Sequence, residues 1–332
     1  MLHRLFGITL IAGSFAIAWL LMSINDFSSK PLSLPDTVIA YELPPGSSLA
    51  AVAKDLEAKG YLDSALFFKL MVRWEGQASK IKAGEYDLHA GITPKQLINL
   101  FVSGKVKSHS FTIVEGWTFK ELLAAINRHT SLKQTLEGLN RKDVMARLGY
   151  PDMDPEGRFL PDTYHFPKGT TDVDFLKRAY KAMETLLTKE WAEREAGLPL
   201  KTPYEALILA SIVEKETGQA EERPEIAGVF VRRLRKGMLL QTDPTVIYGM
   251  GDRYKGNIRR RDLREDTPYN TYVHKGLTPT PISMPGAHAI KSVLHPAKGK
   301  TLYFVAKGNG YHAFSKTLTE HNSAVRKYQL KR

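Results

Sequence analysis

A glutamate at the end of an apolar helical segment is the residue whose setting most favours chemistry. Residues 207–217 read LILASIVEKET. At about 100° per residue, Leu209, Ile212 and Val213 share one helical face, and Glu216 falls on that same face. A charged glutamate on an apolar face is disfavoured without a partner, so burial raises its pKa. Such a side chain can hold a proton near neutral pH and donate it to a substrate.

Two structural interpretations compete with this chemical one. Glu214 and Lys215 point to other helical faces, and the segment could be the solvated last turn of a helix that ends before Gly218. Glu216 could also form an ion pair with an arginine of the sequence VRRLRKG, residues 231–237. Structural ion pairs occupy such positions too, so spacing alone leaves all three interpretations open.

Helix signals on both sides of this glutamate indicate how it is positioned. Thr202 is a suitable N-cap and Pro203 a suitable first helical residue, so the helix is predicted to begin there. A second helix is predicted over residues 223–235, and Gly237 ends it. The glutamate helix therefore stands next to a strongly basic helix in the chain.

Two segments after these helices combine hydrogen-bonding side chains with aromatic rings. They are residues 241–249 and 268–272, and their amides, hydroxyls and rings are suited to gripping and stacking on sugars. A pair of well-capped turns would explain the same composition, and both interpretations remain open. The candidate substrate-binding residues are Gln241, Thr242, Asp243, Tyr248, Tyr269 and Asn270.

The N-terminus is predicted to be a membrane anchor. Leu5–Ile24 is a run of 20 residues without a charge, enough to cross a hydrocarbon core of about 30 Å. With Arg4 before the run, residues 1–4 are expected in the cytoplasm and the rest of the chain outside it. A cleaved signal peptide is the alternative, but its apolar part is normally shorter and a small-residue cleavage site follows it. Residues 25–35 are interpreted as a linker.

The next part of the chain repeats a strand, a glycine turn and a helix. The predicted strands are Val38–Leu43, Glu85–Leu88 and Phe111–Val114, and the helices that follow them are Leu49–Lys59, Lys95–Val102 and Phe119–Ile126. Each helix has a serine or threonine at its N-cap. Residues 36–107 are predicted to form a small α+β subdomain, and the PGSSLAAVA sequence at 45–53 resembles a LysM-type glycan-binding module.

Further elements are predicted in the larger C-terminal part. Asp172–Arg194 shows the pattern of a long amphipathic helix. Two strands, Leu302–Ala306 and Tyr311–Ser315, are followed by a helix from Thr319. The whole chain is thus predicted to be α+β, with a transmembrane helix, the small subdomain and a mixed α/β domain over residues 108–332.

Composition excludes several classes of function. The 332 residues carry a formal charge of +12, which favours a polyanionic or lipid surface, but the basic residues are spread out and match no nucleic-acid motif. No cysteine is present, which rules out disulfides and thiol catalysis. The histidines lack metal-binding spacing, and neither a phosphate-binding loop nor a serine elbow occurs. We expect no metal, no cofactor and no nucleic acid, and any chemistry to depend on carboxylates.

The order of several motifs closely resembles the YceG-like family of endolytic murein transglycosylases. These motifs are Ala210–Thr217, Val229-Phe230-x-x-Arg233-Leu234, Leu240–Gly249, Tyr269–Tyr272, Phe159–Tyr164, Gly276-Leu277, and His295–Ala297. The resemblance extends from the anchor to the last helix. One departure is GLTPTP at 276–281, where the family more often has Leu-Pro-Pro-Gly.

The resemblance implies a cell-wall enzyme. Members are single-pass proteins of the inner membrane, with a LysM-like subdomain and a catalytic domain in the periplasm. They cut nascent peptidoglycan strands internally, leave 1,6-anhydro-N-acetylmuramic acid ends, and are thought to stop elongation by cell-wall synthases, the penicillin-binding proteins. The family's catalytic glutamate is the second in the VEKET-type motif, which corresponds to Glu216.

One acid suffices for this reaction. Glu216 is expected to protonate the glycosidic oxygen and then to remove the proton of the C6 hydroxyl as that oxygen attacks C1. Asp243 is then not needed as a nucleophile. Two alternatives from other classes are a non-catalytic peptidoglycan-binding scaffold and a hydrolytic muramidase that uses Glu214 or Asp243 as its second carboxylate.

Overall fold

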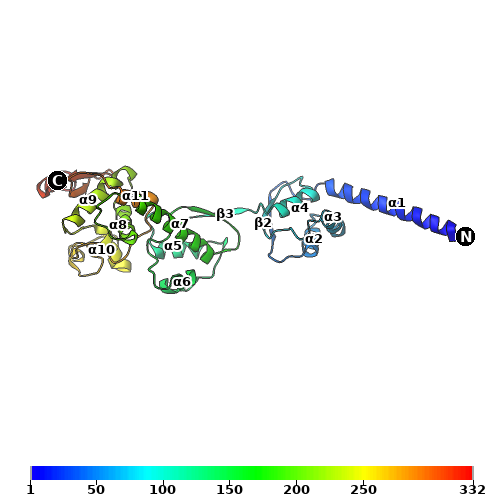
Figure 1. The fold of residues 1–332 in the computed structure, drawn as a ribbon, viewed down its shortest axis with the longest axis horizontal. Helices are drawn as coiled ribbons and strands as arrows, with labels where there is room; N and C mark the ends of the chain where they lie inside the picture. Colours follow the sequence, from blue (N-terminus) through cyan, green and yellow to red (C-terminus); the bar gives the residue numbers. More distant parts are fainter. Residues whose placement is uncertain (1, 331–332) are drawn as a thin grey trace. The chain divides into compact units, whose positions relative to one another are not determined.

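The computed structural model describes residues 2–330, which form two compact units. The first unit contains the chain up to His109 together with His165–Gly169, and the second contains Ser110–Tyr164 and the chain from Thr170 onward. Helices and short two-stranded sheets make up both units (Figure 1). The predicted mixed α+β class is confirmed.

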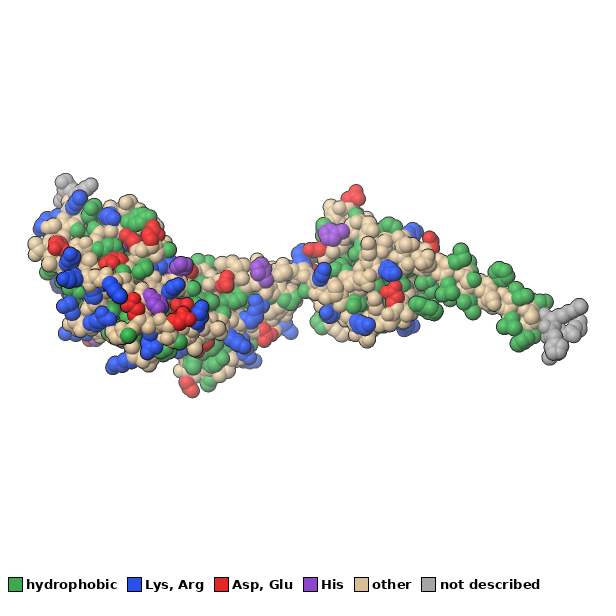
Figure 2. Space-filling model, turned by 45° about the horizontal axis from the view of Figure 1, so that its top comes forward, with side chains coloured by type: hydrophobic (Ala, Val, Ile, Leu, Met, Phe, Trp, Pro, Cys, Tyr) green, Lys and Arg blue, Asp and Glu red, His purple; other side chains and the backbone are tan. Residues whose placement is uncertain are grey.

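The chain begins with a long apolar helix, α1 (Leu2–Ser29). Its segment Phe6–Ser29 is long and apolar enough to cross a membrane, as an anchor or a signal sequence would be. Figure 2 shows apolar side chains (green) on the outside of this helix. Phe15 and Trp19 of α1 are 74% and 66% exposed. Of the predicted cytoplasmic residues 1–4, Met1 lies outside the described residues.

The helix α1 continues past the predicted end of the span at Ile24. Residues 25–29, predicted as part of a linker, are helical, and Phe27 and Leu32 are buried in the core of the first unit. The rings of Phe27 and Phe67 have centroids 5.9 Å apart. Because these apolar side chains are buried in that core, the segment is packed against the first unit and is not a free linker.

The first unit is built around a two-stranded sheet and three short helices. Strand β1 (Ile39–Leu43) pairs antiparallel with β2 (Gly84–Leu88), and the helices are α2 (Leu49–Ala58), α3 (Ala65–Trp74) and α4 (Pro94–Ser103). Ser48 and Thr93 cap α2 and α4, as predicted. The rings of Tyr41 and Tyr86 both contact Phe101 in the core, at centroid distances of 5.9 and 4.9 Å.

Strands β3 (Ser108–Thr112) and β5 (Thr163–Pro167) pair where the chain passes from one unit to the other. The other elements of the second unit are α5 (Phe119–Ile126), β4 (Leu132–Lys133), α6 (Arg141–Leu148), β6 (Thr170–Thr171), α7 (Asp172–Ala192), α8 (Pro203–Glu216), α9 (Arg223–Arg235), α10 (Asp243–Met250), α11 (Ala287–Leu294), β7 (Tyr303–Ala306), β8 (His312–Ser315) and α12 (Leu318–Tyr328). Strands β4 and β6 are parallel, and β7 and β8 antiparallel.

Helix α8 is the central element of the second unit. Helices α7, α9, α10 and α11 contact it, and every residue from Ala206 to Val213 is buried (Figure 1). The predicted apolar face of Leu209, Ile212 and Val213 is buried, and the other faces of this part of the helix are buried too, because a helix enclosed by neighbours is apolar all round. Burial therefore extends beyond the face that carries Glu216.

Two helices of this unit were not predicted. The segment 241–249 contains α10, with Pro244 in its first turn. Helix α11 follows a stretch rich in proline and glycine, and this composition is typical of a loop, so no helix was predicted there. Both helices contact α8.

Candidate functional site

A pocket of about 400 Å³ in the second unit opens at the C-terminal end of α8. Its walls come from α8, α9, the segment before α10, the β7–β8 hairpin and α12. The polar and aromatic residues that line it are Glu216, Arg233, Gln241, Asp243, Tyr272, Tyr303, Phe304, His312, His321 and Gln329.

Glu216 is the last residue of α8, and the extended backbone of Thr217 ends the helix there. The Glu216 side chain is partly buried at the pocket wall, and the hydroxyl of Thr242 donates a hydrogen bond to its Oε1. Burial raises the pKa of Glu216 to about 7; the Thr242 bond lowers it, the Asp243 charge raises it, and the Arg233 charge lowers it. The carboxyl group is therefore about half protonated near neutral pH.

The segment 241–243 is held in place against Thr271 and Tyr272. The backbone of Gln241 has a φ of 50°, and its N–H donates to the carbonyl of Thr271 at 3.1 Å. The N–H of Thr242 donates to the Thr271 hydroxyl at 3.1 Å. The hydroxyl of Tyr272 donates to Asp243 Oδ1 at 2.6 Å. These bonds fix the Thr242 hydroxyl that contacts Glu216.

Arg233 brings a positive charge to the same pocket. Its Nε donates to the carbonyl of Leu302 and its Nη1 to that of Leu240, both at 2.7 Å, and its guanidinium lies 5.2 Å from the centroid of the Tyr303 ring. Burial lowers the pKa of Arg233. Among the described ion pairs, none joins Glu216 to an arginine of α9, so the predicted alternative of a structural ion pair does not describe this site.

The remaining predicted binding residues do not line this pocket. The Tyr248 hydroxyl donates to Glu156 at 2.8 Å, and the Tyr269 hydroxyl contacts that of Thr280 at 2.9 Å. Asn270 is buried, and its Nδ2 donates to two backbone carbonyls. The structure thus brings Gln241, Thr242 and Asp243 to Glu216, while Tyr248, Tyr269 and Asn270 bond within the protein.

Glu214 lies in a different environment from Glu216. Its side chain is only 4% exposed, Arg223 Nη2 donates to it at 2.8 Å, and the N–H of Gly286 does so at 2.9 Å. Burial raises the pKa of Glu214, while Gly286 and Arg223 oppose that shift. Arg223 also contacts Glu115 at 3.1 Å. Glu214 therefore fastens α8 to neighbouring segments and does not face the pocket.

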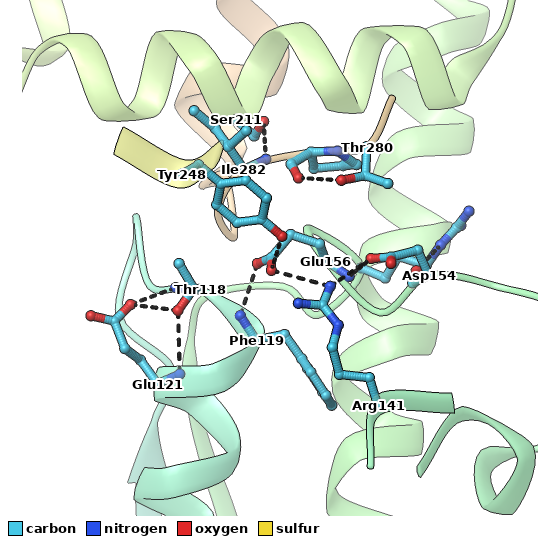
Figure 3. Close-up of polar contacts among 12 residues, drawn as sticks. Thr118, Phe119, Glu121, Arg141, Asp154, Glu156, Ser211, Tyr248, Thr280 and Ile282 are labelled. Atoms are coloured by element: carbon cyan, nitrogen blue, oxygen red, sulfur yellow. Dashed lines mark hydrogen bonds and ion pairs between the residues drawn. The ribbon is translucent and has the colours of Figure 1, made fainter. Parts of the chain in front are cut away.

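A second buried acid, Glu156, was not singled out by the sequence. Its carboxylate accepts from the N–H of Phe119 and the hydroxyl of Tyr248, both at 2.8 Å, and Arg141 Nη2 lies 3.4 Å from it. Figure 3 shows these three contacts. It is 0% exposed, and burial raises its pKa to about 7 although these three contacts lower it. Its partners come from α5, α10 and α6, which are distant from one another in the chain. The spacing of residues near Glu156 could therefore not predict these contacts.

The first unit has a wider groove of about 800 Å³. Side chains of β2, α4 and the segments that follow each of them line it, including Asp87, His89, Gln96, Asn99, Ser103, Lys105 and Lys107. No acid that lines this groove has the combination of partial burial and raised pKa found at Glu216. Among the described residues, no group of three histidines or acids in either unit is arranged to hold a metal ion.

The chain is similar to known proteins along most of its length. A model of the YceG-like family matches residues 41–327. An endolytic murein transglycosylase of Bacillus subtilis is 34% identical over 96% of this chain and 91% of that protein. One of Streptococcus pneumoniae is 30% identical over 82% of this chain, which spans 55% of that longer protein. The crystal structure of a yceG-like protein from Listeria monocytogenes has a TM-score of 0.54, with 31% identity, and covers 87% of this chain and all of the other.

Proposed function

The chain belongs to the YceG-like family, and we propose that it is an endolytic lytic transglycosylase of peptidoglycan. It cleaves the bond between N-acetylmuramic acid and N-acetylglucosamine in nascent strands and leaves 1,6-anhydro-N-acetylmuramic acid ends. The proposal depends on the Glu216 carboxyl group, which has a pKa of about 7 and lines the pocket. A carboxyl with this pKa is suited to give and take a proton in one catalytic cycle.

The mechanism uses Glu216 twice. As an acid it gives its proton to the glycosidic oxygen while the bond to C1 breaks, and the 2-acetamido group of the substrate helps to stabilise the positive charge at C1. As a carboxylate it then removes the proton of the C6 hydroxyl, whose oxygen bonds to C1 and closes the anhydro ring. Thr242 donates to Oε1, which fixes the carboxyl plane and leaves Oε2 for proton transfer.

A hydrolytic muramidase is the second candidate, because Asp243 lines the pocket beside Glu216. In that reaction Asp243 assists a water molecule or forms the glycosyl intermediate. Its carboxylate already accepts a hydrogen bond from Tyr272 and raises the pKa of Glu216 by its charge. These contacts favour an electrostatic role for Asp243 over a nucleophilic one. Glu214 is the weaker second acid, because Arg223 and Gly286 engage it.

The test is the chemistry of the new glycan ends. Purified strands are incubated with the full chain, and fragments are separated and weighed by mass spectrometry; anhydro and reducing ends differ by one water. Anhydro ends from wild type and none from Glu216→Gln are expected. Reducing ends alone would establish the muramidase, and binding without cleavage would establish a scaffold.

We further propose that α1 is an uncleaved anchor in the inner membrane, with the N-terminus in the cytoplasm and both units in the periplasm. The apolar span and the arginine before it support this topology. In that place the enzyme meets strands as synthases such as penicillin-binding proteins extend them. A reporter that works only outside the cytoplasm, fused after Arg332, is expected to be active. Activity of a cytoplasmic reporter at the same position would contradict the topology.

Residues 36–107 are proposed to be a LysM-like glycan-binding subdomain, and residues 108–332 the catalytic domain. The resemblance of residues 45–53 and the polar groove of the first unit support the first assignment. Asn99→Ala and His89→Ala in the full chain are expected to weaken retention on isolated sacculi without changing cleavage of short strands. Unchanged retention would mean that this unit is a spacer or a protein-docking surface.

A further inference from the structure

The β7–β8 hairpin contributes a histidine to the pocket of Glu216. His312, the first residue of β8, lines this pocket, and its side chain is 11% exposed. The rings of Phe304 and Phe314 flank it, at centroid distances of 5.4 and 6.5 Å. The mechanism above assigns no role to it, although it is the kind of residue that binds or shifts protons.

A buried carboxylate holds this histidine at two atoms. Glu222, which ends a short 3-10 helix (Ala220–Glu222), accepts from the backbone N–H of His312 through Oε1 at 2.8 Å. Its Oε2 lies 2.8 Å from Nδ1 of the same residue. The Glu222 side chain is 10% exposed. One carboxylate therefore fixes both the backbone and the ring of His312.

This pairing sets the state of the other ring nitrogen. A carboxylate only accepts, so Nδ1 carries the hydrogen, and in the neutral ring Nε2 is left as an acceptor. The hydrogen bonds of His312 within the described part of the chain run from its backbone N–H and Nδ1 to Glu222, and neither of them uses Nε2. Histidines that must present one nitrogen in a fixed direction are commonly oriented by a carboxylate on the other.

We propose that His312 is a substrate-contacting residue, oriented by Glu222 so that Nε2 accepts a hydrogen bond from a sugar hydroxyl in the Glu216 pocket. The inference rests on the proposed function and adds a named contact to it. The contact helps to hold the glycan while Glu216 transfers its proton. Glu222 is a positioning residue, since it acts through the ring of His312.

Two replacements of His312 separate contact with the glycan from support of the hairpin. Asparagine keeps a polar group near the position of Nδ1, so it can still bond to Glu222, but it has nothing at the position of Nε2. Glutamine reaches the position of Nε2 and gives up the Nδ1 bond. Tyr311→Phe is the matched control, because Tyr311 precedes His312 and bonds to Glu221 at 2.8 Å without lining the pocket.

Binding is measured in a Glu216→Gln background, so that the probe, purified peptide-free glycan strands, stays uncut. His312→Asn is expected to weaken affinity roughly two- to tenfold, the value of one neutral hydrogen bond. Its melting temperature should stay unchanged. His312→Gln is expected to recover part of the affinity, and Tyr311→Phe to bind like the parent.

An affinity equal to the parent in His312→Asn would overturn the inference. A loss that comes with a lower melting temperature and that glutamine does not recover would overturn it too, because His312 would then only support the hairpin. The cleavage assay tests the proposed reaction independently of the contact of His312 with the glycan. If wild type forms no anhydro ends while His312→Asn still weakens binding, the proposed reaction falls and the contact of His312 with the glycan stands.

Discussion

Glu216 and Glu156 are acids of the second unit, the first partly and the second fully buried, and burial raises the pKa of each to about 7. Their surroundings differ. Glu216 reaches a pocket of about 400 Å³ and accepts one hydrogen bond from a protein hydroxyl, that of Thr242. Glu156 is 0% exposed and is surrounded by an amide, a phenol and a guanidinium (Figure 3). A raised pKa reports removal from water, and access for a substrate must be judged separately.

The comparison assigns different work to the two acids. Glu156 joins the N-terminus of α5 to α10 and lies near Arg141 of α6, so its carboxylate oxygens are used within the fold. Glu216 keeps an oxygen for a substrate. Perturbed carboxyls mark functional sites only as a tendency, and under the proposed function these two acids illustrate both outcomes within one unit.

The largest expected effect is on cleavage by Glu216→Gln. The amide keeps the volume and the hydrogen bond from Thr242 but cannot deliver or accept the proton, so kcat is expected to fall by about 10²–10⁴-fold or more. The melting temperature should change little. Release of anhydro-ended fragments measures the first quantity and thermal unfolding the second.

Two further glutamines serve as controls for that experiment. Glu156→Gln and Glu214→Gln also remove one acid each, but from positions that do not line the pocket. Both are expected to retain most of the activity of the folded enzyme. A loss of release in Glu214→Gln together with full activity in Glu216→Gln would reverse the assignment of the catalytic acid.

The second expected effect is on stability, in Glu156→Leu. The change leaves the Phe119 N–H and the Tyr248 hydroxyl without acceptors in the interior. Each such buried group costs about 1–3 kcal/mol, so the free energy of unfolding is expected to fall by roughly 2–6 kcal/mol. Urea titration at fixed pH measures it. A glutamine at this position should cost less, since its oxygen still accepts from Phe119; equal losses in the two variants would mean that packing matters and the hydrogen bonds do not.

Local signals in the sequence predicted many of the elements that carry these acids. Helix α5 has the predicted bounds Phe119–Ile126, and α8 begins at the predicted Pro203 after its Thr202 cap, because caps and proline act within one turn. The sequence put Glu214 and Glu216 on different helical faces but could not predict the partners of either, since Thr242 and Gly286 are distant from both in the chain. The contribution of His312 to the same pocket depends on the fold for the same reason.

The third expected effect is on the pH dependence of activity and stability. Each acid has a folded pKa of about 7 against an ordinary 4.5, so the folded state binds more protons between these values. The stability contributed by each is present below about pH 4.5 and is lost as pH rises through 7, on the order of 3 kcal/mol per acid. The proposed mechanism requires protonated Glu216, so kcat/KM should fall about tenfold per pH unit above 7.

Single variants show which acid causes the loss of stability and which causes the fall of kcat/KM as the pH rises. Glu156→Gln should remove part of the alkaline loss of stability and leave the fall of kcat/KM above pH 7 where it is. Chemical unfolding and initial rates between pH 5 and pH 9 measure both. A shift of the activity profile in Glu156→Gln would mean that the two acids are coupled, and the comparison between them would fail.

The smallest expected effect comes from deleting one hydroxyl donor beside each acid. Thr242→Val removes the donor to Glu216, and Tyr248→Phe removes a donor to Glu156. Each hydrogen bond lowers the pKa of its acid, so each deletion should raise that pKa. A neutral hydrogen bond is worth about 0.5–1.5 kcal/mol, which sets the size of either change.

Thr242→Val should therefore move the alkaline fall of kcat/KM to higher pH, because Glu216 then stays protonated up to a higher pH. Tyr248→Phe should lower the melting temperature slightly and leave that profile unchanged, because the proton on Glu156 takes no part in cleavage. If the profile moved in Tyr248→Phe and not in Thr242→Val, the acid that limits the rate would be Glu156.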